Sequence, residues 1–151
     1  MPNWCYNRIR IDADSDQVEQ LKEIHDIFNN HEDPFNQILP IPDFKNIPND
    51  KGELPVLRRE LNKDGSVFYE TYDFPDGKND DRWYHWCISN WGTKWELSEL
   101  DIEYDEESLE LTFSTAWSPP EGIVAELRDK YPDLGFTCFY DEPGMEAAGY
   151  Y

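Results

Sequence analysis

Residues 109–124 read LELTFSTAWSPPEGIV, and they contain the clearest strand and the clearest helix start in the chain. In the first half of this stretch, the residues of one face alternate with polar residues, which is the period of a half-buried strand; that face carries Leu109, Leu111, Phe113, Thr115 and Trp117. The second half, Ser118-Pro119-Pro120-Glu121, has the form of a capping box with proline in the first helical position. The stretch therefore predicts a strand followed by a tight turn into a helix.

Further strands are predicted on both sides of this stretch. Apolar and polar residues alternate at residues 3–11, 94–104 and 134–140. The apolar phase changes near Ser98-Glu99, which predicts a β-bulge there. Residues 142–151 carry two glycines and predict a short edge strand.

Two more helices are predicted. Apolar residues recur at helical spacing from Val18 onward and predict a helix of about 13 residues, with Asp14 or Ser15 as its N-cap. Residues 83–92 are dense in aromatic side chains and predict a short Trp-rich helix, which Gly92 ends in the left-handed conformation.

Residues 29–82 differ in character from the rest, since they hold six of the 11 prolines and several turn signals, among them Asp76-Gly77. A structureless loop of this length is rare inside a compact domain. Residues 56–61 and 67–74 flank a short polar turn and predict a β-hairpin. We therefore treat residues 1–151 as a single domain, with 29–82 as an insertion within it.

Without the insertion, the predicted elements follow the order βαββαβ. This is the split βαβ arrangement of a ferredoxin-like sandwich, in which two long helices cover one face of an antiparallel sheet. The predicted fold class is therefore α+β and ferredoxin-like, with an inserted Pro-rich segment and a short Trp-rich helix.

Four short motifs resemble the YubB-type ferredoxin-like family, which phages, plasmids and other bacterial mobile elements encode. The motifs are PNWCYN at 2–7, WCISNWGTKW at 86–95, TAWSPP at 115–120 and YDEPG at 140–144. The likeness covers residues 1–28 and 83–151. It implies the ferredoxin-like fold and a mobile-element setting, but it implies no activity and no catalytic residue.

The composition is strongly acidic, with 13 Lys and Arg against 33 Asp and Glu, so the formal charge is −20. Such a chain repels phosphates, so we expect no direct binding to nucleic acid. The sequence shows no apolar run near the ~18 residues of a membrane span and no signal-peptide start, which favours a cytoplasmic protein of the bacterial host. Aliphatic residues are few and 6 of the 23 aromatic residues are tryptophan, which predicts a tryptophan-rich core.

The cysteine and histidine pattern argues against an enzyme. Cys5, Cys87 and Cys138 fit neither a disulfide framework nor a metal-binding pair, so we expect three buried thiols in a reducing compartment. His85 lies two residues before Cys87, a spacing that does not bring two side chains together on a helix. Since no catalytic motif is present, we expect a non-enzymatic protein without a cofactor.

A calcium loop is a weak alternative near the first predicted helix. Asp12, Asp14, Asp16 and Glu23 match the acidic positions of an EF-hand, but Gln17 stands where the loop needs glycine. We expect these carboxylates to cap the helix, and we expect no bound metal.

The strand after the Trp-rich helix carries a regular row of acids. Carboxylates alternate with apolar residues and continue through the next turn: Glu99, Asp101, Glu103, Asp105, Glu106, Glu107 and Glu110. The row predicts either a solvated face that keeps the domain soluble or a partner-binding face that imitates the charge of a nucleic acid strand. On the first strand, Arg8 and Arg10 point to one sheet face, where we expect Tyr6 and, on a neighbouring strand, Phe139. We expect both arginines to pair with acidic neighbours.

The clustered aromatic residues offer a second candidate site. A pocket could be lined by Trp83, His85, Trp86, Asn90, Trp91 and Trp117. The same tryptophans could instead form the core that an aliphatic-poor chain needs.

The leading hypothesis is a non-enzymatic acidic binding protein that acts on a host or phage protein. In its sharper form, the protein is a DNA-mimic inhibitor of a nucleic-acid-binding defence or regulatory protein. The alternative is a small-ligand-binding protein or an enzyme that uses the tryptophan, histidine and asparagine pocket.

Overall fold

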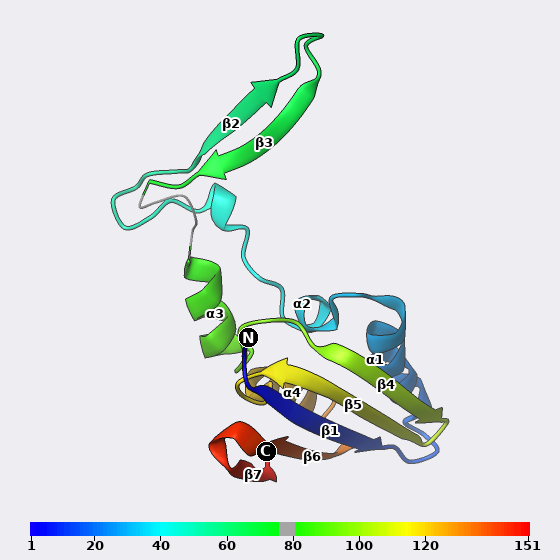
Figure 1. Ribbon diagram of the computed structural model, residues 1–151. Helices are drawn as coiled ribbons and strands as arrows, with labels where there is room; N and C mark the ends of the chain where they lie inside the picture. Colours follow the sequence, from blue (N-terminus) through cyan, green and yellow to red (C-terminus); the bar gives the residue numbers. More distant parts are fainter. Residues whose placement is uncertain (76–80) are drawn as a thin grey trace. The chain divides into compact units, whose positions relative to one another are not determined.

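The structure, a computed structural model, describes residues 1–75 and 81–151. The chain forms two compact units, Met1–Pro40 with Trp86–Tyr151 and Ile41–His85. The first unit is a sheet covered by helices, and the second contains a β-hairpin (Figure 1).

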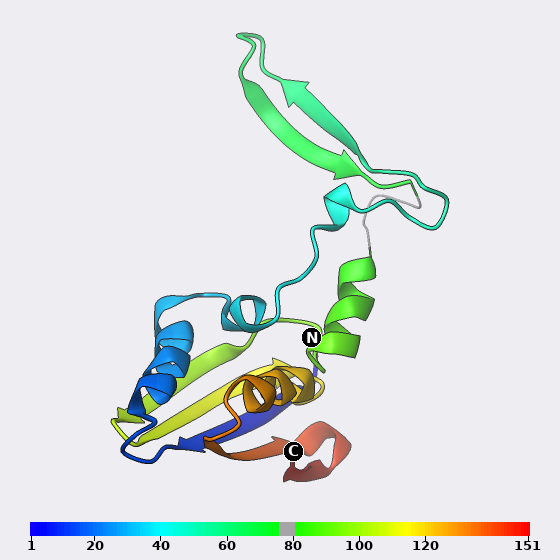
Figure 2. The same cartoon turned by 180° about the vertical axis from the view of Figure 1, so that it is seen from behind.

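The first unit contains a five-stranded antiparallel sheet in the order β4-β5-β1-β6-β7. Its strands are β1 (Trp4–Asp12), β4 (Ser98–Asp105), β5 (Ser108–Ala116), β6 (Gly135–Glu142) and β7 (Ala147–Tyr150). Helices α1 (Val18–Asn30) and α4 (Glu121–Lys130) lie behind the sheet in Figure 1 and in front of it in Figure 2. The α+β ferredoxin-like prediction is therefore confirmed, and β7 is the predicted edge strand.

The two faces of the sheet follow from the alternation along β1. Cys5, Asn7, Ile9 and Ile11 are buried, whereas Tyr6, Arg8 and Arg10 between them are exposed. Ile9 and Ile11 lie opposite Leu111 and Leu109 of β5, and all four side chains are fully buried. The helices complete this core with Leu21, Ile24, Phe28, Ile123, Val124 and Leu127.

The prediction of a tryptophan-rich core is wrong. Trp91 is the one tryptophan that is fully buried, while Trp83, Trp95 and Trp117 are 38%, 41% and 44% exposed. Isoleucine, leucine and phenylalanine already fill the single layer between the sheet and the helices. The other tryptophans belong to α3 (Arg82–Asn90) and to the ends of strands, where the layer offers them no space.

The predicted helix caps are also wrong. Helix α4 begins at Glu121 with Pro120 as N-cap, and the Ser118 hydroxyl donates to the Gly92 carbonyl instead of capping the helix. Helix α1 begins at Val18, as predicted, but its N-cap is Gln17 and no side chain caps it. The Ser118 hydroxyl is drawn to a tertiary partner, which competes with the cap for the same group. Before α1, the Gln17 side-chain oxygen accepts from the Asp14 backbone N–H at 3.2 Å.

Glycines allow the end of α3 to approach the start of α4. Gly92 adopts the predicted left-handed conformation, with φ of 92°. The Gly122 N–H donates to the Trp91 carbonyl at 2.9 Å. A Cβ atom on Gly122 would lie 1.7 Å from the Asn90 carbonyl oxygen, so no larger residue fits between the two helix ends.

The start of β4 depends on a carboxylate clamp. The strand begins at Ser98, later than predicted, and the predicted bulge is confirmed by a register shift between Ser98 and Asp101. Just before the strand, the Glu96 carboxylate accepts from the backbone N–H groups of Phe35 at 3.1 Å and Asn36 at 2.8 Å. These bonds tie the short helix α2 (Pro34–Ile38) to the sheet and leave no strand pairing for the residues around Glu96.

The second unit contains the predicted hairpin, β2 (Val56–Leu61) and β3 (Val67–Asp73), and a short helix η1 (Phe44–Asn46). Residues 29–40 of the predicted insertion lie instead in the first unit, where they complete α1 and form α2. The predicted turn at Asp76-Gly77 lies outside the described residues.

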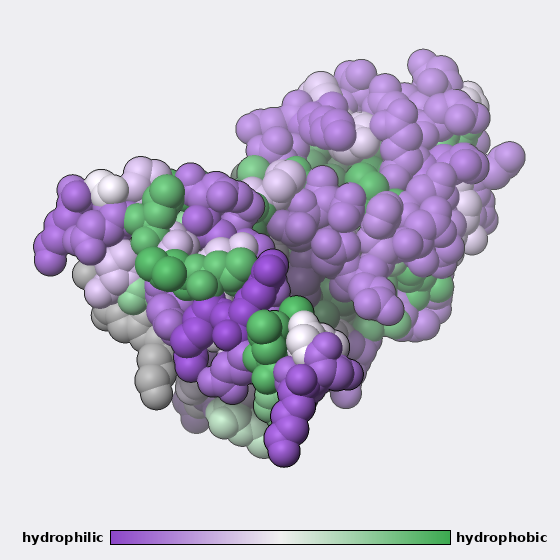
Figure 3. Space-filling model, turned by 90° about the horizontal axis from the view of Figure 1, so that it is seen from above, coloured by the Kyte–Doolittle hydropathy of each residue, from purple (hydrophilic) through white to green (hydrophobic). Residues whose placement is uncertain are grey.

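The hairpin pairs its two strands by an antiparallel ladder, buries little, and carries charge pairs across the strands. Arg58 pairs with Asp73 at 3.1 Å, and Arg59 pairs with Glu70 at 2.6 Å across the two strands. Apolar side chains on it are exposed to solvent, among them Val56, Leu61, Val67, Phe68 and Tyr69. Apolar patches of this kind interrupt a mostly hydrophilic molecular surface (Figure 3).

We predict that Gly122→Ala destabilises the first unit. Alanine normally stabilises a helix relative to glycine, but here its Cβ would collide with the Asn90 carbonyl. We expect the free energy of unfolding to fall by about 1–3 kcal/mol, measured by urea denaturation. Gly135→Ala is the matched control, because a Cβ there meets its nearest atom at 3.8 Å, and equal losses in the two variants would contradict the prediction.

We predict a pH-dependent contribution from Glu96. Burial raises the pKa of its carboxyl from 4.5 to about 6, against the opposing effect of its bonds to Asn36 and Phe35. Because the folded-state pKa is above the ordinary value, this group favours folding below pH 4.5, and the contribution is lost as pH rises through about 6. In urea denaturation between pH 4.5 and 7, the stability of Glu96→Gln should decline less with rising pH than that of the parent. The control is Glu106→Gln, at an exposed turn, whose stability should change with pH as that of the parent does. If the plots of stability against pH are parallel for all three proteins, the predicted contribution of Glu96 is wrong.

Candidate functional site

The candidate site is the open face of the sheet, by which we mean the face opposite α1 and α4. Its outward residues are fixed by strand register: Arg8 of β1 lies opposite Thr112 of β5 and Phe139 of β6, and Thr112 lies opposite Asp101 of β4. Directly opposed residues point to the same side of a sheet. The open face therefore gathers side chains from strands that are distant in sequence.

One edge of the open face carries the acidic row, Glu99, Asp101, Glu103 and Asp105. All four side chains are exposed, and no Lys or Arg among the described residues lies within ion-pair distance of them. Glu99 occupies the bulge with φ of 56°, while the other three follow at strand spacing of roughly 6.8 Å. Glu103 lies opposite Glu110, which adds a second carboxylate to the same part of the face.

The two arginines at the centre of the face are engaged. Arg8 Nε lies 3.3 Å from a carboxylate oxygen of Glu110, and Arg10 Nε lies 3.3 Å from one of Asp12. The predicted pairing of these arginines with acidic neighbours is confirmed. Because Arg8 pairs with Glu110 and Arg10 pairs with Asp12, neither arginine neutralises a carboxylate of the acidic row.

Two hollows lie along this face. A shallow one of about 350 Å³ is lined in part by Tyr6, Arg8, Glu99, Phe139 and Asp141. A smaller one of about 240 Å³ lies near the β4–β5 turn, where Glu103, Asp105 and Glu110 surround Arg10. The smaller hollow therefore holds three carboxylates against one guanidinium.

The remaining acids of the predicted face occupy the turn. Glu106 and Glu107 lie between β4 and β5 and are exposed. The Glu107 carbonyl accepts from the Ala13 N–H at 2.9 Å, which fixes the turn against the loop after β1. The turn thus holds the end of the acidic row in place.

The structure disperses the residues predicted to line a tryptophan pocket. Trp83 lines a cavity of the second unit that none of the other five residues lines. Trp91 is buried in the first unit, where its indole N–H donates to the Leu39 carbonyl at 2.8 Å. The remaining residues of that set, His85, Trp86, Asn90 and Trp117, lie on α3 or just after β5.

The polar members of that set have local partners. The Asn90 amide donates back to the Trp86 carbonyl at 2.9 Å, and His85 Nε2 lies 3.8 Å from a carboxylate oxygen of Asp81. Trp117 has a φ of 70°, a strained value for a bulky residue, and its N–H donates to the Asn3 carbonyl. The structure does bring Trp86 and Trp91 together, with ring centroids 6.1 Å apart in an edge-to-face contact.

The cysteines are buried, as predicted. Burial raises the pKa of the Cys5, Cys87 and Cys138 thiols to about 11, so each remains a thiol at neutral pH. Within residues 1–75 and 81–151, no three His, Cys, Asp or Glu side chains come together in a way that would hold a metal ion. Asp12, the first acid of the calcium-like pattern, pairs with Arg10.

Aromatic side chains lie at the other edge of the open face. Phe139 and Tyr150 lie on neighbouring positions of β6 and β7, with ring centroids 5.2 Å apart, and both are exposed. The prediction that Phe139 lies near Arg8 on this face is confirmed, whereas sequence reasoning missed Tyr150. Tyr150 had no alternation to mark it, because its strand is four residues long.

Comparison with known proteins supports the fold. Residues 90–151 match the model of the ferredoxin-like domain in Api92-like protein. This segment contains β4, β5, α4, β6 and β7, so it includes the acidic row and the aromatic edge of the open face. No curated protein matches the chain.

A solved structure extends the likeness to nearly the whole chain. The crystal structure of a protein Api92 from Yersinia pseudotuberculosis superposes with a TM-score of 0.57 and 13% sequence identity. The alignment covers 99% of this chain and 93% of that chain. At this identity, the similarity establishes the ferredoxin-like fold alone. In the described parts of the chain, no helix has the length and apolar character needed to cross a membrane.

Proposed function

We propose that this protein is a non-enzymatic binding protein whose acidic row holds a cationic segment of another protein. The observation that carries the proposal is the set of uncompensated carboxylates on β4, on a sheet face that no helix covers. Glu103 and Asp105, which have no ion-pair partner among the described residues, line one hollow with Glu110 and Arg10, and a lysine or arginine side chain of the partner would pair with these two carboxylates.

The energetics favour several weak contacts over one strong contact. An ion pair between exposed groups contributes roughly 0–1 kcal/mol, so a single lysine gains little on this face. A segment with three or four cations in register with the row would gain more, and the charge of −20 would steer it toward the protein. Both effects weaken as salt shortens the Debye length below about 8 Å.

The geometry bears on the sharper hypothesis of DNA mimicry. Strand spacing gives the row one charge per roughly 6.8 Å, whereas one strand of DNA carries one per ~3.4 Å of helix axis. Glu110, which could start a second row, is already paired with Arg8. A flexible basic segment therefore suits the row better than a groove shaped for duplex DNA. A nucleic-acid-binding defence or regulatory protein of the host or phage remains the narrower form of the proposal, and the mobile-element setting remains a prediction.

The competing function, a ligand-binding protein or enzyme with a tryptophan-lined pocket, has less support. Of its six residues, Trp83 alone lines the cavity of the second unit, and its nearest thiol, Cys87, is buried with a raised pKa. The proposal therefore assigns no catalytic residue and no cofactor.

The test uses a fluorescent ten-residue lysine peptide and the triple variant Glu99→Gln, Asp101→Asn, Glu103→Gln. We expect the dissociation constant to rise about tenfold at low salt, which corresponds to ~1.4 kcal/mol shared among three weak contacts. Fluorescence anisotropy measures the affinity, and the difference should shrink in 0.5 M salt.

The matched control removes the same charge from the helices on the other face: Glu19→Gln, Glu126→Gln, Asp129→Asn. Circular dichroism verifies that both variants fold. If the control loses as much affinity as the row variant, the peptide senses net charge alone and the proposed site is wrong.

A further inference from the structure

The second unit contains a cavity of about 750 Å³, within the size range of small-molecule sites. All of its lining residues belong to this unit: Ile41, Pro42, Asp43, Phe44, Lys45, Glu70, Thr71, Tyr72, Phe74 and Trp83. They come from three separate segments, around η1, at the end of β3 and at the start of α3. Neither the acidic row nor the proposed function involves this cavity.

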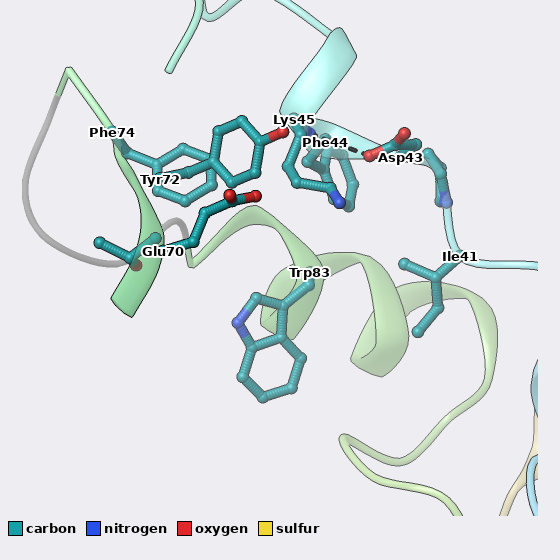
Figure 4. A pocket seen from close by; sticks show the side chains of 10 residues that line it. Ile41, Asp43, Phe44, Lys45, Glu70, Tyr72, Phe74 and Trp83 are labelled. Carbon is teal, nitrogen blue, oxygen red and sulfur yellow. Dashed lines mark hydrogen bonds between the residues drawn. The ribbon is translucent and has the colours of Figure 1, made fainter. Parts of the chain in front are cut away.

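Aromatic rings dominate the wall. Trp83 stands across the opening from Tyr72 and Phe74, while Phe44 and Lys45 of η1 form a third side (Figure 4). Trp83 is 38% exposed, so its ring is accessible from solvent. Aromatic rings arranged around an opening favour a flat aromatic occupant, which can stack on one ring and meet others by their edges.

The carboxylates of the wall are already engaged. Glu70 forms the 2.6 Å ion pair with Arg59. Asp43 accepts from the backbone N–H of Lys45 at 3.3 Å and from the Asn46 amide at 2.7 Å. Arg59 therefore compensates the charge of Glu70, whereas Asp43 keeps its charge and its two oxygens are held by neutral donors of η1.

Lys45 supplies the uncompensated charge. Its ammonium group lies 5.2 Å from the centre of the Tyr72 ring, and no carboxylate among the described residues lies within ion-pair distance of it. A second cation, Arg82, lies 5.0 Å from the centre of the Phe44 ring and donates to the Phe44 carbonyl at 3.0 Å. Among the residues that line the cavity, Lys45 thus supplies the one cationic group, and it has no ion-pair partner among the described residues.

The segment as a whole is not cationic, because residues 41–85 hold seven Lys and Arg against ten Asp and Glu. Charges farther than about 8 Å are largely screened at physiological salt, so the groups at the wall govern what enters.

We propose that this cavity binds a small aromatic molecule bearing one anionic group, with its ring among Trp83, Tyr72 and Phe74 and its carboxylate or phosphate on Lys45. A cationic ligand fits less well, because Lys45 already occupies the cation position over Tyr72 and would repel it. The ligand is opposite in charge to the partner of the acidic row, so the two proposals can fail independently.

The test compares three probes that share one ring system: 1-naphthoate, 1-naphthyl phosphate and 1-naphthylmethylamine. Amide chemical shifts of the isotope-labelled full chain report both the affinity and the location of binding. We expect the two anions to bind about tenfold more tightly than the amine, with shifts concentrated at Lys45, Tyr72 and Trp83. The ratio between naphthoate and naphthyl phosphate identifies which anionic group the site prefers.

Three variants examine the role of the charge. Lys45→Met should remove the preference for anions, and Lys45→Arg should restore it. Lys51→Met is the matched control, because Lys51 is an exposed lysine of the same unit that does not line the cavity. Equal or tighter binding of the amine, absence of saturable binding by all three probes, or unchanged anion affinity in Lys45→Met would each overturn the proposal.

Discussion

Strand β1 must present apolar side chains to the helices on one face and polar side chains to solvent on the other, and the rest of the first unit depends on this constraint. It pairs with β5 on one side and β6 on the other, so it lies near the middle of the sheet. Its inward side chains, Ile9 and Ile11 among them, are fully buried beneath the helices. Its outward side chains face solvent and include both arginines of the open face. A shift of one residue in register would place Arg8 and Arg10 in the core. The register of β1 therefore determines which face of the sheet α1 and α4 must cover.

The position of the helices decides what the acidic charge can do. Because both long helices lie on the buried side of β1, the opposite face stays open, and the carboxylates of β4 remain in water without a large desolvation cost. The arginines of β1 compensate Glu110 and Asp12 and do not reach the acidic row. In the second unit, Arg59 pairs with Glu70, and the backbone N–H of Lys45 donates to Asp43. The ammonium group of Lys45 has no carboxylate within ion-pair distance among the described residues. One strongly acidic chain thus presents, within its described residues, unpaired carboxylates on the open face of the first unit and an unpaired lysine at the cavity of the second.

The likeness to Api92 is consistent with these constraints. A ferredoxin-like sandwich requires apolar residues at alternating inward positions and fixes the order of strands, but it leaves the open face free to vary. Sequence identity of 13% over nearly the whole chain shows that the fold tolerates wide substitution. The chemistry of the open face and of the aromatic cavity must therefore be argued from the residues of this chain.

The sequence by itself determined the local features: the alternation of β1 and β5, the extent of α1 from Val18, the hairpin, the bulge at Glu99 and the left-handed Gly92. Each of these depends on neighbours within a few residues, where periodicity and backbone conformation act directly. The tertiary structure alone decided which aromatic residues are buried, how α4 is capped, that Glu96 clamps α2, and that Lys45 meets Tyr72 and Trp83. Those outcomes join segments tens of residues apart, and they depend on competition for space and hydrogen-bond partners that no local pattern records.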